Sequence, residues 1–148
     1  MALAFVVLAF TGFIAHSYAL TSEFDAEVKQ IVVDCAETGL EEKKVVFMNA
    51  WNENIIPEAD HDKCFFACVM RQLKALADGK FEVDVINFLA TQRYGDPAEV
   101  EKAKMINAGC VGGDKGNSDD CAVSFELMKC FTEAANKANL QSIQKVIF

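Results

Sequence analysis

The sequence predicts an all-α fold, a compact bundle of helices held together by disulfides. Apolar residues recur at helical spacing along most of the chain, and no segment alternates apolar and polar residues as a half-buried strand would. The chain also carries six cysteines, an even number. Its 148 residues, 52% hydrophobic and 24% charged, suffice for one globular domain with its own core.

The first 19 residues have the properties of a secretion signal. "MALAFVVLAFTGFIAHSYA" is an apolar run that ends with small residues, Ser17 and Ala19, at the two positions that a signal peptidase reads. A membrane anchor is the alternative, but the run is short for a span and Thr11, Gly12 and His16 interrupt it. We therefore expect a signal peptide at 1–19, a helical domain at 20–148 and an extracellular protein.

The first half of that domain predicts three helices. A capping-box pattern at 22–25 begins the first, whose apolar residues continue to Cys35 before a stop at Gly39. Residues 38–41 cap the second, which carries Val45, Val46, Met48 and Trp51. The third begins at Asp60 or Asp62 and is apolar on every side over 64–70, so we expect it to be buried all round.

The second half predicts three more helices and a tail. A turn at 78–79 precedes a short helix over 83–90. Asp96 as N-cap and Pro97 as first residue begin a helix that runs to Cys110. Residues 109–120 are expected to form an exposed loop, and Asp119 or Asp120 caps the last long helix. The tail would place Leu140, Ile143 and Ile147 on one side if it is helical.

The cysteine spacing favours disulfides over other uses. On a helix, Cys64 and Cys68 have Cβ atoms about 5–6 Å apart, whereas a disulfide needs about 3.8 Å. Each must therefore pair with a different element, which leaves several pairings open. A structural zinc site usually has two close pairs of ligands; here there is one pair, and His61 is the only histidine after residue 19. We expect no metal and no cofactor.

Enzymatic and nucleic-acid functions find no support. The chain has no nucleotide fingerprint, zinc-protease helix or nucleophile elbow. His61 would need catalytic partners that the sequence does not supply, so a solvated histidine at a helix start is the better interpretation. A net charge of −8 repels nucleic acid. We predict a non-enzymatic protein that binds no nucleic acid.

The cysteine pattern identifies a family. The arrangement Cys35-x28-Cys64-x3-Cys68-x41-Cys110-x10-Cys121-x8-Cys130 resembles the six-cysteine signature of insect odorant-binding proteins, which include the pheromone-binding proteins. The segment "CFFACVMRQLKALADGKFEVDVINFL" also resembles the family's third helix, glycine turn and fourth helix. The resemblance covers essentially all of residues 20–148.

The resemblance implies about six helices around an apolar cavity and three disulfides, Cys35–Cys68, Cys64–Cys121 and Cys110–Cys130. It also implies ligand contacts from several elements. Trp51 and Phe131 are the strongest candidates, because they match pocket aromatics of pheromone-binding members. The other candidates, for which plain core packing is equally compatible with the composition, are Phe66, Met70, Leu76 and Val28.

The implied function is transport of a small hydrophobic molecule, volatile or lipid-like, through aqueous lymph, with an olfactory receptor or membrane surface as the place of delivery. The polar groups that would orient an alcohol, aldehyde or ester head are not evident. A histidine pH gate, found in some members, is not expected with His61 alone. The tail after Cys130 either covers the cavity as a lid or is frayed in solvent. The protein is either a monomer or a homodimer.

Two alternatives stay open at this point. The same fold serves as a lipophilic carrier in secreted fluids outside olfaction, and the sequence does not name the tissue. A membrane-active helical protein of the saposin kind is also small, helical and rich in disulfides, but its cysteine spacing differs.

Overall fold

The computed structural model describes residues 23–36, 39–55, 62–112 and 119–140, and within these it has six α-helices. The all-α prediction is confirmed. The predictions for the signal peptide at 1–19, His61 and the tail beyond Leu140 fall outside the described residues. The helices are residues 23–35, α2 (Leu40–Met48), α3 (Lys63–Gln72), α4 (Val83–Arg93), α5 (Pro97–Val111) and α6 (Asp120–Lys137).

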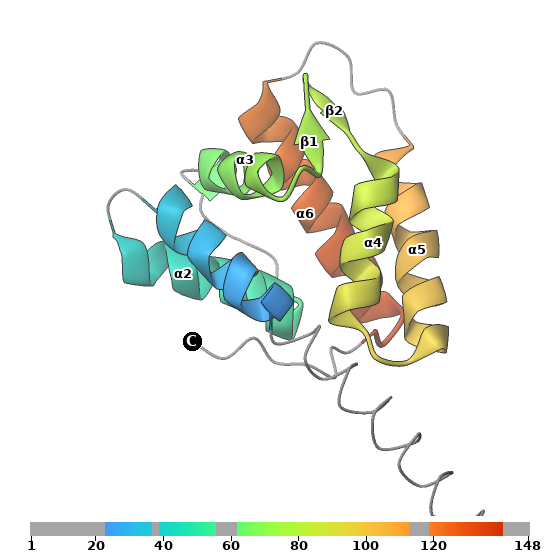
Figure 1. Ribbon diagram of the computed structural model, residues 1–148. Helices are drawn as coiled ribbons and strands as arrows, with labels where there is room; N and C mark the ends of the chain where they lie inside the picture. The colour runs from blue at the N-terminus through green and yellow to red at the C-terminus, as the bar shows by residue number, and fades with distance from the viewer. Residues whose placement is uncertain (1–22, 37–38, 56–61, 113–118, 141–148) are drawn as a thin grey trace, which may run out of the picture.

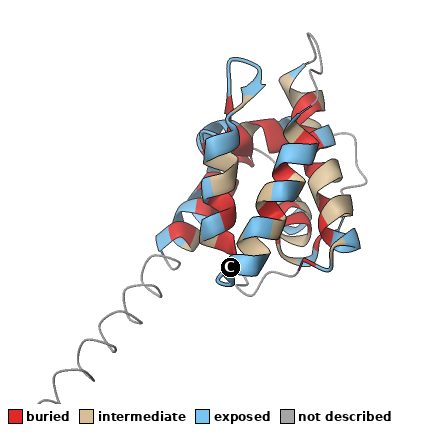
Figure 2. Ribbon diagram, turned by 90° about the vertical axis from the view of Figure 1, so that its right-hand side faces the viewer, coloured by how far each residue is buried: buried red, intermediate tan, exposed pale blue. Residues whose placement is uncertain are grey.

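The helices form two groups that meet at α6. On one side α3 packs against α6, with the first helix and α2 beyond it (Figure 1). On the other side α4 and α5 lie next to each other, and α5 packs against α6. Buried positions face the interior of this arrangement and exposed positions face outward (Figure 2), as amphipathic helices require.

Local sequence signals explain where the later helices begin. The carboxylate of Asp96 accepts a hydrogen bond from the backbone N–H of Ala98 at 2.8 Å, and Pro97 is the first residue of α5. Asp62 precedes α3 and Asp119 precedes α6. These three starts agree with the prediction. Part of the loop expected over 109–120 is helical, because α5 continues to Val111 and α6 begins at Asp120, and residues 113–118 fall outside the described residues.

A small hairpin interrupts the helices, although the sequence shows no alternating strand. Strands β1 (Leu76–Ala77) and β2 (Lys80–Phe81) pair antiparallel, Leu76 opposite Phe81 and Ala77 opposite Lys80. Strands of two residues are too short to produce an alternating pattern. The predicted turn is present, with positive φ at Asp78 (50°) and Gly79 (74°). Two left-handed central residues define the type I′ turn, which Asp-Gly sequences favour.

A π-helical turn, η1 (Asn49–Glu53), follows α2 directly. The backbone N–H of Asn54 donates to the carbonyl of Asn49, five residues earlier, and Asn54 then ends the turn in the left-handed region (φ 52°). The wider turn holds Trp51 and Ala50 in the buried interior. Short π-helical insertions of this kind often occur at functional sites.

Three disulfides connect the helices, and all six cysteines take part. They join the first helix to α3 through Cys35–Cys68, α3 to α6 through Cys64–Cys121, and α5 to α6 through Cys110–Cys130. These are the same pairs that the family resemblance implies. The helix α3 is less uniformly buried than expected: Phe65 to Ala67, Val69 and Met70 are buried, but Cys64 is exposed.

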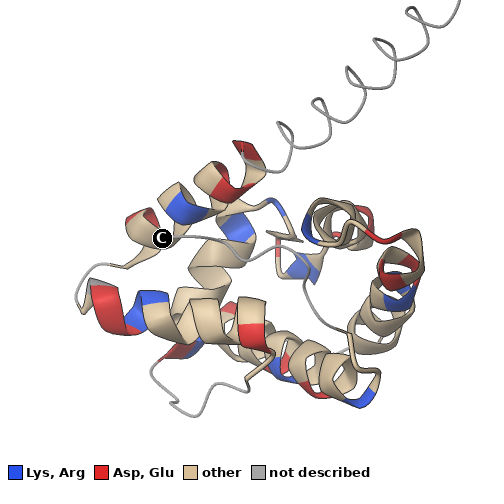
Figure 3. Ribbon diagram, turned by 90° about the horizontal axis from the view of Figure 1, so that it is seen from below, with Lys and Arg blue, Asp and Glu red and all other residues tan. Residues whose placement is uncertain are grey.

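Lysine and arginine are interspersed with aspartate and glutamate over the helices (Figure 3). The ion pairs are local, as between Lys104 and Glu101, or link helix ends, as Arg71 of α3 does with Asp120 of α6. Exposed pairs of this kind contribute little to stability, typically about 0–1 kcal/mol each. Packing and disulfides therefore carry the fold.

Candidate ligand-binding cavity

A cavity of about 60 Å³, partly open to the surface, lies where η1, α3, α4, α5 and α6 meet. Its volume is several times the roughly 10–15 Å³ that one water molecule needs. Its walls are almost entirely apolar. The lining residues are Trp51, Met70, Ile86, Leu89, Ala90, Arg93, Tyr94, Asn107, Leu127, Met128 and Phe131.

Helix periodicity explains why α4 supplies more residues to this wall than any other element. Ile86, Leu89, Ala90 and Arg93 are three, four and seven residues apart, so they share one face of the helix. The outer face of α4 carries Phe88, which is 57% exposed. One side of the helix therefore faces the cavity and the other faces solvent.

Three of the predicted contact residues lie at the cavity wall: Trp51 from η1, Met70 from α3 and Phe131 from α6. Trp51 is stacked on Phe47, with ring centroids 5.8 Å apart and an interplanar angle of 17°. This contact fixes one face of the indole, since Phe47 is itself fully buried. Trp51 is also the only tryptophan of the chain.

The other three predicted contact residues, Phe66, Leu76 and Val28, are buried but do not line this cavity. Phe66 lies among the rings of Phe47, Phe65 and Phe125, with centroids 5.8–6.5 Å apart. We call this group the aromatic core: Phe24, Phe47, Phe65, Phe66 and Phe125, with Trp51 at its edge. Any ligand contact of Phe66, Leu76 and Val28 stays a prediction.

Sequence reasoning missed the polar end of the cavity, which Arg93 and Tyr94 form. Arg93 is only 4% exposed. Its guanidinium carbon lies 4.7 Å from the centroid of the Trp51 ring and 5.3 Å from that of Tyr94. The sequence did contain a signal for this position, because Arg93 falls on the same helix face as the apolar residues Ile86, Leu89 and Ala90. An arginine near the end of a helix is usually interpreted as facing solvent.

Burial shifts the titration of both groups. It lowers the pKa of the Arg93 guanidinium, and the neighbouring Tyr94 partly offsets this. Burial raises the pKa of the Tyr94 hydroxyl; Arg93 opposes that shift and Glu99 adds to it. A guanidinium nevertheless stays protonated in proteins. At neutral pH the cavity therefore has one cation and one neutral phenol at this end.

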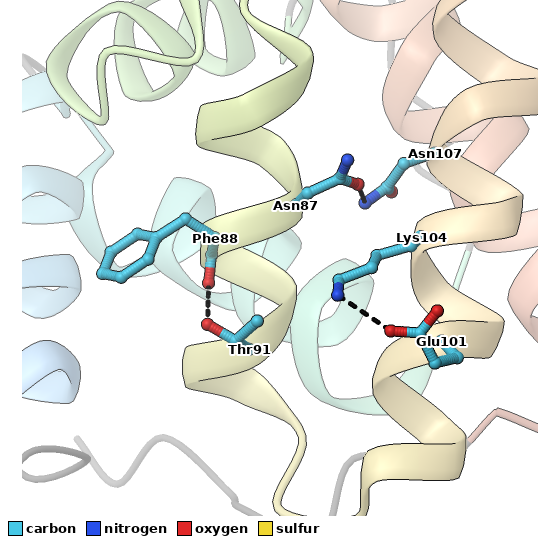
Figure 4. A network of polar contacts seen from close by, with 6 residues as sticks. All are labelled: Asn87, Phe88, Thr91, Glu101, Lys104 and Asn107. Carbon is cyan, nitrogen blue, oxygen red and sulfur yellow. Dashed lines mark hydrogen bonds and ion pairs between the residues drawn. The ribbon is translucent and has the colours of Figure 1, made fainter.

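Asparagines tie the helices together around this end. Asn107 of α5 donates its amide to the Oδ1 of Asn87 on α4 at 3.1 Å (Figure 4). The Nδ2 of Asn54 donates to the carbonyl of Leu140 at 2.7 Å, and the Nδ2 of Asn136 donates to the carbonyl of Asn54 at 2.6 Å. The end of η1 is thus joined to the end of α6 beside Arg93.

Within the described residues, no three or more His, Cys, Asp or Glu side chains gather closely enough to hold a metal ion. In the same part of the chain, no helix combines the length and the hydrophobicity needed to span a membrane. The arrangement offers an apolar enclosure with a charged residue, Arg93, in its wall.

Comparisons with known proteins agree with this geometry. The model of the PBP/GOBP family matches residues 17–134. Among solved structures, the odorant-binding protein dmelOBP28a from Drosophila melanogaster has a similar fold, with a TM-score of 0.57 and 22% sequence identity over 84% of this chain and 97% of that one. No curated protein matches the sequence.

Proposed function

Since the chain belongs to the PBP/GOBP family, we propose that it is a carrier that holds small hydrophobic molecules, odorants or pheromones, in the cavity between η1, α3, α4, α5 and α6. The observation that carries this proposal is the cavity itself, with nearly all of its wall apolar and with Trp51 and Phe131 on it. Pockets for small molecules are typically concave, mostly apolar and lined by aromatic side chains.

Removal of apolar ligand surface from water would drive binding. Burial of about 300 Å² of such surface contributes roughly 7 kcal/mol at about 25 cal/mol per Å². Loss of ligand freedom offsets part of that gain. We therefore expect dissociation constants of about tens of micromolar or weaker for neutral ligands.

Secretion is part of the same proposal. The apolar run at 1–19 would act as the signal peptide and be removed, so that the carrier is residues 20–148. The three disulfides support this, because such bonds persist in oxidising, extracellular compartments.

Displacement of a fluorescent apolar probe tests the proposal. The protein is residues 20–148 with its three disulfides verified by mass spectrometry, and the competitors are volatile and lipid-like molecules. We expect saturable uptake of the probe, with a change in the emission of Trp51 when the cavity is filled. If no probe enters at any pH, the protein is not a carrier of this kind.

Matched variants locate the binding. Trp51→Ala and Phe131→Ala should each weaken uptake while the helical content by circular dichroism is retained. Phe88→Ala removes an aromatic ring from the exposed face of α4 and serves as the control. Equal affinities in all three variants would place the ligand outside this cavity.

Two further measurements separate this carrier from the alternatives. A membrane-active protein of the saposin kind would release the contents of lipid vesicles, whereas a carrier leaves them intact. The site of expression distinguishes an olfactory carrier, present in antennae, from a carrier in another secreted fluid.

A further inference from the structure

Arg93 is a buried cation at the wall of an otherwise apolar cavity, and the described residues give it no anionic partner. Of its five N–H donors, the described part of the chain records one hydrogen bond, from Nη2 to the Oδ1 of Asn54, and this bond is long at 3.4 Å. Its Nε is buried with no hydrogen-bond partner among the same residues. A buried guanidinium left in this state loses its hydration without full compensation.

The groups around Arg93 do not neutralise it. Trp51 and Tyr94 present ring faces to the guanidinium, and Asn54 presents an amide oxygen. Glu99 influences Tyr94 electrostatically, and within the described residues it forms no ion pair with Arg93. The Tyr94 hydroxyl is also buried, and no described residue hydrogen-bonds to it. One buried cation and one buried phenol with a spare donor therefore lie together in the cavity wall, where little polar surface is exposed to the cavity.

From this geometry we propose that the cavity selects amphiphiles with a carboxylate head, which Arg93 binds while an unbranched apolar chain lies along Met70, Ile86, Leu89 and Phe131. The inference rests on the carrier function proposed above and names its ligand class. A guanidinium pairs with a carboxylate through two parallel N–H···O bonds, and such charge-assisted bonds are the strong ones.

The charge count favours a carboxylate over a phosphate ester. Arg93 is the only charged residue among those that line the cavity in the described chain. A carboxylate brings one negative charge to this one cation. A phosphate monoester brings about 1.5–2 negative charges at neutral pH, which would leave an excess of negative charge in a low-dielectric site near Glu99.

Four ligands that share one alkyl chain test the proposal: decanoate, decanol, methyl decanoate and decylamine. Each competes with a neutral fluorescent probe at neutral pH on residues 20–148. We expect decanoate to bind at least tenfold more tightly than decanol or the ester, and decylamine to bind worst. The net charge of −8 attracts cations in general, so a preference for the anion would come from the site.

Variants of Arg93 assign the preference to this residue. Arg93→Met keeps most of the length of the side chain and removes the charge, so the ratio of decanoate affinity to decanol affinity should fall tenfold or more. Arg93→Lys keeps the positive charge but lacks the two parallel N–H donors of the guanidinium, so it should retain part of the preference for decanoate. Circular dichroism and the binding of decanol show whether each variant folds, so a folding failure is not taken for a loss of selectivity.

The outcomes separate the two proposals. If neutral ligands bind and decanoate has no advantage, the carrier function holds and the carboxylate inference is wrong. That inference is also wrong if decanoate keeps its advantage in Arg93→Met, or if the advantage appears only after removal of residues 141–148, which would mean that the chain's own terminal carboxylate occupies Arg93. If a probe binds but none of the four ligands displaces it, the carboxylate inference is wrong; if no probe binds at all, the carrier function itself fails.

Discussion

The two sides of the cavity are built from different kinds of residue. The aromatic core on the α3 side fills its interior with large rings, and Phe47 and Phe66 in it are fully buried. The interior on the α4–α5 side contains Ala90, Ala103, Ala135, Tyr94 and Leu140, which we call the alanine cluster. Wall residues come from both: Trp51 and Met70 from the side of the aromatic core, Ala90 and Tyr94 from the alanine cluster.

The cavity lies where these two kinds of interior meet. Its wall includes residues of both groups, large side chains on one side and the small Ala90 on the other. The disulfides follow the same division, since two of the three hold α3 and only one holds α5. The molecule thus combines a solid half, formed by the aromatic core, with a hollow half, in which the alanine cluster borders the cavity.

The largest expected effect comes from deleting a ring in each half. Phe66→Ala should lower the free energy of unfolding by about 3–5 kcal/mol, because it opens a hole in close packing. Phe131→Ala should cost much less, since this side chain is only half-buried and borders empty space. Chemical denaturation with the disulfides intact measures both. Equal losses would show that the hollow half is packed as tightly as the solid one.

Removal of a disulfide from each half is expected to have the next largest effect. Replacement of both cysteines by serine should cost about 4 kcal/mol for Cys64–Cys121, which closes 57 residues, and about 3 kcal/mol for Cys110–Cys130, which closes 20. Both bridges join two helices that line the cavity, α3 with α6 and α5 with α6, so probe affinity should fall in both variants. Guanidinium unfolding and probe titration of each variant measure the two effects; unchanged affinity in both variants would contradict the expectation.

Added volume should be tolerated in one half only. Ala67→Leu places a larger side chain in the fully buried middle of α3 and should cost about 1–3 kcal/mol. In Ala90→Leu the larger side chain extends into the cavity, so the free energy of unfolding should change by less than about 1 kcal/mol, because the space is already empty. The same substitution should reduce probe uptake about tenfold by filling that space. Unchanged uptake in Ala90→Leu would show that ligands bind elsewhere.

The smallest expected effect is that of Tyr94→Phe. The hydroxyl is buried and has no hydrogen-bond partner in the described part of the chain, so its removal leaves no group unsatisfied and should alter the free energy of unfolding by less than about 1 kcal/mol. Decanol should bind as before. Thermal unfolding measures the stability; a loss of several degrees in the melting temperature would mean that an ordered water satisfies this hydroxyl.

The fold was predictable from the sequence to the level of helices and turns. Asp96 and Pro97 are local signals, and they place the start of α5 correctly because capping depends on neighbouring residues. The Asp78–Gly79 turn was predictable for the same reason. The π-helical turn at Trp51 was not, because an i→i+5 hydrogen bond leaves no characteristic sequence pattern.

The candidate site was predictable only in part. Trp51, Met70 and Phe131 were found through the family resemblance, which carries spatial information from other chains. Phe66 and Leu76 are apolar like these residues, but they pack in the interior. Residue type alone does not distinguish a core position from a cavity-wall position. Arg93 depends on how α4 is rotated against Trp51 and Asn54, and that rotation is a property of the assembled helices.

The helix α4 contributes more residues to the cavity wall than any other element, yet it carries no cysteine. Every other α-helix that lines the cavity has a covalent link to a neighbour. If the cavity holds a ligand as proposed, we therefore expect outward movement of α4 to open it more easily than movement of α3, α5 or α6. We expect its amide protons to exchange with solvent faster than those of α3 and α6, and a bound ligand to slow them.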